Sequence, residues 1–156
     1  MTDAVSLIQS DHRVLEKLLH QLRDPDVDRV AVVDEVAARL TAHRSATEQV
    51  YPLLAGAAKP AEAAAGPAPA IPDLGPAQER LDALRSCDPD SERFEEALKE
   101  FADAVTHHIQ VEETDVLPEF AVDDDPALLE RAGATFETER VRELKVYGID
   151  DPTPGQ

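Results

Sequence analysis

The stretch that decides the fold is residues 94–112, which read FEEALKEFADAVTHHIQVE. Its apolar side chains recur at steps of three and four residues, a spacing typical of a helix that buries one face. The apolar positions are Phe94, Leu98, Phe101 and Val105. The same stripe then continues into His108 and Glu112. This stretch therefore predicts a long amphipathic helix whose buried face becomes polar near its end.

The same periodicity outlines the other helices, and no stretch alternates with period two for long enough to indicate a sheet. The stripes are Val5, Ile8, Leu15, Leu19 and Leu22, then Val33, Val36, Leu40, Val50 and Leu54, then Leu74, Ala77, Leu81 and Leu84, and finally Leu128, Leu129, Ala132, Phe136 and Val141. Three pairs have the form of a helix N-cap followed by proline at the first helical position, namely Asp24-Pro25, Asp88-Pro89 and Asp125-Pro126. All these patterns favour helices.

The predicted fold is all-α, an antiparallel up-down four-helix bundle with an extra C-terminal helix at residues 126–146. Residues 55–75 are rich in alanine and proline, which predicts an extended linker between the second and third helices. We expect a single domain over residues 1–148, followed by a flexible tail at residues 149–156.

Composition excludes several classes of function. The 156 residues include 15 Lys and Arg against 33 Asp and Glu, for a net charge of −18. Such a balance argues against nucleic acid and against an anionic membrane surface. No apolar run reaches the roughly 20 residues of a membrane helix, and the N-terminus lacks the pattern of a signal peptide. The single cysteine, Cys87, is typical of a reducing cytoplasm, so we expect a cytoplasmic protein.

Titratable side chains interrupt the apolar stripes at His12, His43, His108 and Glu112. Glu112 follows His108 by four residues, so both point the same way from one helix. His12 and His43 lie equally far from the turn between the first two helices, so antiparallel helices place them at one level. Glu48 follows His43 by five residues, within reach of the same ion. Four helical positions and Glu48 are thus expected to converge.

A buried carboxylate is costly unless it is paired or bound to a metal, which makes this convergence informative. Imidazole and carboxylate groups without a thiolate suit iron, manganese or zinc. Iron is favoured over manganese or zinc where coordination positions stay open for a small ligand. The sequence therefore predicts a metal site inside the bundle.

The motifs around these residues resemble the hemerythrin-like (HHE cation-binding) family over about residues 4–120. They are Ser10-Asp11-His12, the stretch from His43 to Pro52, and the stretch from His107 to Pro118. The resemblance implies a four-helix bundle with a non-haem, usually di-iron, centre that binds a diatomic molecule or a peroxide. The metal ligands that it implies are His12, His43, His108 and Glu112, with Glu48 as a further bridging or terminal carboxylate. Any enzymatic activity would be that of a non-haem iron oxidoreductase.

Two departures from the family pattern leave other functions open. Thr47 stands where the second helix of the family carries glutamate, and Leu74 stands where the third helix carries histidine. Glu48, assisted by a local bulge in the second helix, would replace the first ligand, and Asp73 or Glu79 the second. One alternative is a metal-free or metal-depleted bundle that acts as an interaction or structural module. Another is an oxygen-dependent oxidase with an apolar substrate cavity beside Leu74.

Overall fold

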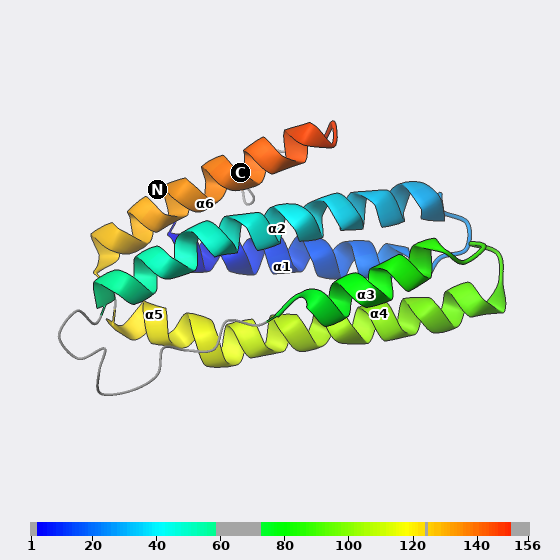
Figure 1. Ribbon diagram of the computed structural model, residues 1–156, viewed down its shortest axis with the longest axis horizontal. Helices are drawn as coiled ribbons and strands as arrows, with labels where there is room; N and C mark the ends of the chain where they lie inside the picture. Colours follow the sequence, from blue (N-terminus) through cyan, green and yellow to red (C-terminus); the bar gives the residue numbers. More distant parts are fainter. Residues whose placement is uncertain (1–2, 59–72, 124, 151–156) are drawn as a thin grey trace.

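The structure, a computed structural model, describes residues 3–58, 73–123 and 125–150, and the regular structure in these ranges is helical. The elements are α1 (Ala4–Gln21), α2 (Arg29–Ala58), α3 (Gly75–Arg85), α4 (Glu92–Val111), the π-helical turn η2 (Glu112–Val116), α5 (Leu117–Asp123) and α6 (Pro126–Val146). In Figure 1, α1 and α2 lie side by side, α3 lies along α4, η2 and α5 continue the line of α4, and α6 lies beside α2. The predicted all-α bundle with an extra C-terminal helix is confirmed.

The structure shortens the predicted linker at both ends, since α3 already begins at Gly75. Helix α2 continues to Ala58, so the first four residues of the predicted linker, 55–58, are helical. The rest of that linker up to residue 72 lies outside the described residues, as do residues 151–156 of the predicted tail. Helix α6 has the predicted bounds.

Of the three predicted helix caps, one is confirmed and two are wrong. The side chain of Asp125 accepts a hydrogen bond from the backbone at the start of α6, as expected. Asp24 and Asp88 instead accept from the backbone N–H two residues further on, each within a turn. The caps of α2 and α4 are Asp28 and Ser91, whose side chains accept from the N–H three residues on. Pro25 and Pro89 therefore belong to the turns, and α2 and α4 begin after them.

Two clusters of buried apolar side chains fill the interior. The turn-side cluster is built by α1, α2, α3 and α4 and includes Leu15, Leu40, Leu81, Phe101 and Val105. The α6-side cluster is built by α1, α2, η2, α5 and α6 and includes Ile8, Ala46, Leu54, Val116 and Phe136. In α1, His12 lies between Ile8 and Leu15, which belong to different clusters, and His43 has the corresponding place in α2. A polar layer therefore separates the two clusters.

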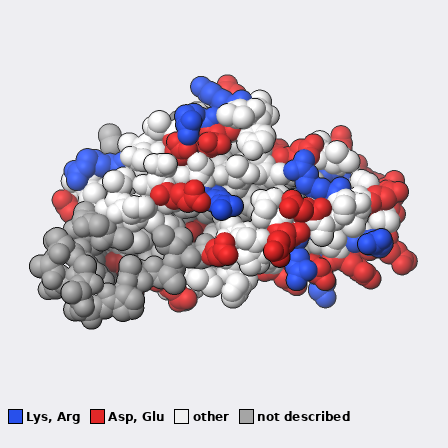
Figure 2. Space-filling model, viewed as in Figure 1, with Lys and Arg blue, Asp and Glu red and all other residues white. Residues whose placement is uncertain are grey.

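The surface agrees with the acidic composition. On the face drawn in Figure 2, Asp and Glu side chains lie among those of Lys and Arg, and the described residues form no broad basic area there. None of the described helices combines the length and the apolar character that crossing a bilayer requires.

Candidate metal centre

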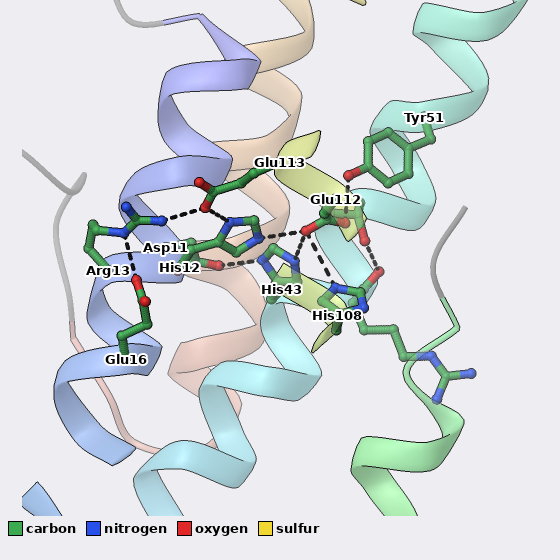
Figure 3. Close-up of polar contacts among 11 residues, drawn as sticks. Asp11, His12, Arg13, Glu16, His43, Tyr51, His108, Glu112 and Glu113 are labelled. Atoms are coloured by element: carbon green, nitrogen blue, oxygen red, sulfur yellow. Dashed lines mark hydrogen bonds and ion pairs between the residues drawn. The ribbon is translucent and has the colours of Figure 1, made fainter. Parts of the chain in front are cut away.

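The polar layer is organised around one oxygen atom of Glu112 (Figure 3). Its Oε1 lies 2.6 Å from Nε2 of His12, 3.0 Å from Nε2 of His43 and 3.4 Å from Nε2 of His108. The three rings come from α1, α2 and α4, whereas Glu112 is the first residue of η2. None of the four residues is more than 5% exposed. Side chains from well-separated parts of the sequence therefore meet at one buried point.

Glu48, the fifth residue predicted for this site, does not join the cluster. Its side chain is 63% exposed and pairs with Arg44, one turn earlier in α2, at 3.1 Å. The predicted bulge in the second helix is not observed, because α2 is α-helical throughout. A position five residues after His43 is then rotated from it by about 140°. Asp73 and Glu79, the expected replacements from the third helix, are also exposed.

The irregular turn lies in η2 instead, and it brings two consecutive carboxylates to one ring. Oε1 of Glu112 faces Nε2 of His12, and Oε2 of Glu113 lies 2.6 Å from Nδ1 of the same ring. The backbone N–H of Leu117 donates to the carbonyl of Glu112, five residues back, which widens the helix. Pro118 follows directly. It has no N–H, and in a regular α-helix its ring would clash with the carbonyl four residues before it, so it disfavours the α-helical ladder here.

Carboxylates also occupy the outer nitrogens of two rings. Oδ2 of Asp11 lies 2.9 Å from Nδ1 of His43, and Oδ1 of the same carboxylate accepts a hydrogen bond from Nε of Arg140 at 3.1 Å. His12 has the corresponding contact with Glu113. Metal-binding histidines commonly donate their second ring N–H to a carboxylate, which fixes the tautomer and the direction of the ring. Both rings are therefore held with Nε2 toward the centre.

Tyr51 fixes the remaining oxygen of Glu112. Its hydroxyl donates to Oε2 at 2.6 Å, and its ring stacks on Phe120 with centroids 5.6 Å apart. Tyr51 is only 1% exposed, so this hydrogen bond is shielded from water. The phenol therefore holds Glu112 with Oε1 directed at the histidines.

The buried charges shift one another's pKa. Burial alone would raise the pKa of Asp11, but contacts with His43 and Arg140 lower it below its ordinary value. Burial alone would lower the pKa of His43, but the carboxylates of Glu112 and Asp11 raise it to about 10. Burial opposes ionisation of Glu112 as well, yet its histidine neighbours hold the pKa of Glu112 well below its usual range. Burial and the charge of Glu112 raise the pKa of Tyr51, which keeps the phenol protonated.

These shifts predict how the stability of protein stripped of metal depends on pH. Because the pKa of His43 is raised, its contribution is fully present below pH 6.5 and is lost as the pH rises to about 10. The lowered pKa of Glu112 gives a contribution that is present above pH 4.5 and is lost on acidification. Thermal unfolding of the chelator-treated protein should show the alkaline loss. His43→Gln should reduce this loss and the exposed His20→Gln should keep it; identical alkaline curves for all three proteins would contradict the prediction.

The donor set fits a metal ion. Ligand atoms of His12, His43 and Glu112 all lie within 4.8 Å of one another. Both ring nitrogens of His108 are buried without a hydrogen-bond partner, although Nε2 faces Glu112. Buried polar atoms usually have a partner, and a cation beside Oε1 of Glu112 would supply one to Nε2. Three imidazoles and a carboxylate are suitable ligands for a first-row transition metal.

The helical bundle and the cluster of histidines and carboxylates in its interior place the protein in the class of metal-binding helical proteins. The family model described as Hemerythrin HHE cation binding domain matches residues 3–120, and the chain belongs to this family. Its structure is similar to the crystal structure of a hemerythrin HHE cation binding domain-containing protein from Mycobacterium kansasii, with a TM-score of 0.76 and 20% sequence identity. That match covers 94% of this chain and 90% of the other, and it shows a shared fold. No curated protein matches the sequence.

Asp11, Glu113, Tyr51 and Arg140 take part in the site, and none of them is among the metal ligands predicted from the sequence. Asp11 and Glu113 each stand next to a residue of a buried stripe. Tyr51 lies within the motif of the second helix, and Arg140 interrupts the apolar stripe of α6. These signals are present in the sequence, but each depends on a neighbouring helix for its meaning.

Proposed function

We propose that the protein binds non-haem iron, as one ion or a pair, and that the bound iron takes a small ligand such as dioxygen, peroxide or nitric oxide. The ligands would be the imidazoles of His12, His43 and His108 and the carboxylate of Glu112. One observation carries this proposal: three imidazole nitrogens from three helices converge on a single buried carboxylate oxygen. Membership of the cation-binding family supports it.

The chain's own residues prepare the site for such an ion. Asp11 and Glu113 hold two of the rings by their outer nitrogens, and Tyr51 holds the outer oxygen of Glu112. Iron bound here would supply open coordination positions and a change of oxidation state.

The metal-free alternative has an observation in its favour, because the described residues of the third helical segment contribute no ligand. Asp73 and Glu79 face solvent, and Leu74 packs in the turn-side cluster. In this alternative the histidines and carboxylates only neutralise each other inside the bundle. Metal analysis separates the two functions.

We expect protein produced with added iron to retain iron, and His108→Ala to lose most of it, because the variant removes one ligand from a small set. His20→Ala is the matched control, since His20 is exposed on α1, and it should load like the wild type. Iron is measured by elemental analysis, and near-ultraviolet absorbance tests for an oxo-bridged ferric pair. Equal loading of both variants would mean that the site is elsewhere. Wild-type loading below roughly half an equivalent of iron, manganese or zinc would favour the metal-free bundle.

A further inference from the structure

Arg140 is the largest of the fully buried side chains, and it belongs to α6. This helix lies outside residues 3–120, the part of the chain that the family model matches. Arg140 is 0% exposed and stands in line with Phe136 and Leu144, one turn away on either side. Arginine is rarely buried completely unless its charge is paired. Its position therefore requires an explanation from the groups that it contacts.

Arg140 forms an ion pair with Glu137 of the same helix at 3.6 Å, and a second partner, Asp11, leads to the candidate metal centre. Nε of Arg140 donates to Oδ1 of Asp11 at 3.1 Å, and Oδ2 of Asp11 lies 2.9 Å from Nδ1 of His43. Nε2 of His43 lies 3.0 Å from Glu112. The chain of contacts runs from α6 through α1 to α2, and Asp11 is only 2% exposed. Because water does not reach Asp11, the position of its carboxylate depends on these protein partners.

The equivalent contact at His12 is built differently. Its carboxylate, Glu113, is 24% exposed and is paired with Arg13, whose side chain is 59% exposed. Water and an exposed arginine thus surround that pair, whereas the pair at His43 is enclosed. The phenyl ring of Phe136, also on α6, stands edge-on to His43 with centroids 6.2 Å apart. Helix α6 therefore limits the His43 ring both by packing and by a hydrogen-bonded chain.

We propose that Arg140 is a positioning residue of the metal centre, which fixes the His43 ring through Asp11 so that Nε2 faces the bound metal. The inference rests on the proposed function, because it needs His43 to be a ligand. It makes α6 part of the structure that holds the metal. Asp11, with both oxygens paired, keeps the His43 ring from turning. Because the ring is already fixed, metal binding at Nε2 costs no further rotational freedom of that side chain. Loss of an outer contact of this kind typically lowers metal affinity about 10–100-fold.

The experiment measures Co²⁺ binding, by visible absorbance and chelator competition, in Arg140→Met, Arg140→Lys, Asp11→Asn and the double variant of Asp11→Asn with Arg140→Met. The control is Arg142→Met on the exposed side of the same helix, where Arg142 pairs with Glu139. We expect Arg140→Met and Asp11→Asn each to weaken Co²⁺ binding by about 10–100-fold and to alter the Co²⁺ spectrum. Arg140→Lys should recover part of the affinity, and Arg142→Met should stay within about twofold of the wild type.

The double variant tests whether Arg140 acts through Asp11. If it does, the double variant should bind Co²⁺ no more weakly than the weaker single variant, because the second change finds the contact already lost. Multiplied losses, or an Arg140→Met protein with lower thermal stability but unchanged Co²⁺ affinity and spectrum, would overturn the inference and leave the proposed function intact. If Arg140→Met does not fold, Asp11→Asn and Arg140→Lys decide in the same way, and wild-type affinity in both would overturn it. Failure of the wild type to bind Co²⁺ and iron would overturn both proposals.

Discussion

Glu112→Gln is expected to abolish iron loading and to destabilise the protein stripped of metal. The carboxylate touches three histidines and accepts from Tyr51, and it is 1% exposed. The amide removes the negative charge that compensates the buried His43. Breaking a buried ion pair by removing one partner costs about 3–5 kcal/mol, because the other charge is left uncompensated. The free energy of unfolding is measured in urea on chelator-treated protein, and the iron content on protein produced with iron.

The matched control for this substitution is Glu119→Gln. Glu119 is exposed on α5, one element after Glu112, so the same chemical change should leave iron content and unfolding unaltered. If Glu112→Gln kept both iron and stability, the convergence of histidines on this carboxylate would have no energetic importance. If it lost stability but kept iron, Glu112 would be a structural acceptor and the metal would lie elsewhere.

Phe136→Ala is expected to cost about 3–5 kcal/mol of unfolding free energy, because it opens a cavity in the α6-side cluster. Phe136 is 0% exposed, and it packs among side chains of the cluster that α1, α2 and α5 share with α6. A loss of this size is a large fraction of the stability of an ordinary domain, which is about 5–15 kcal/mol. Denaturant unfolding followed by circular dichroism gives the change.

Val146→Ala on the same helix is the control for the second substitution. Val146 is 74% exposed, so its truncation removes little buried surface. The unfolding midpoint of the Val146→Ala variant should therefore stay close to that of the wild type. Equal losses from both variants would indicate that α6 contributes through helix formation alone and not through docking on α1 and α2.

The helices, and the common level of the histidines in the polar layer, were predictable from local rules. Steps of three and four residues identify each buried face without knowledge of the partner helix. Equal distance from a turn then places His12 opposite His43, and the structure has their ring centroids 5.1 Å apart. The four-residue step from His108 to Glu112 held because α4 remains α-helical up to Val111.

Glu48 shows where reasoning from reach alone fails. A side chain one position beyond a helical repeat is turned about 100° further around the axis, and only a backbone irregularity corrects that. The structure has such an irregularity in η2 and not in α2, so Glu113 contacts the cluster while Glu48 pairs with Arg44 at the surface. The position of a π-helical turn depends on the packing of the helices around it, which one helical stripe does not encode.

Arg140 was missed for a different reason. The prediction assigned Val141 to the buried stripe of the last helix, and arginine is a residue that is rarely buried completely. The structure buries Arg140 fully and leaves Val141 partly exposed. The four-residue spacing from Phe136 through Arg140 to Leu144 was visible in the sequence. Its meaning was not, because Asp11, the partner of Arg140, lies 129 residues earlier in the chain.

The polar layer between the turn-side cluster and the α6-side cluster has a consequence for how the molecule comes apart. Helices α1 and α2 take part in both clusters, and where they pass from one cluster to the other, His12 and His43 interrupt the apolar contact. Within this layer the two ends of the bundle are thus joined by continuous helical backbone and by polar contacts. An ion bound in this layer would hold α1, α2 and the end of α4 together at one point. Neither end of the bundle would then open without the other. Metal would then act on the cooperativity of unfolding as much as on its midpoint.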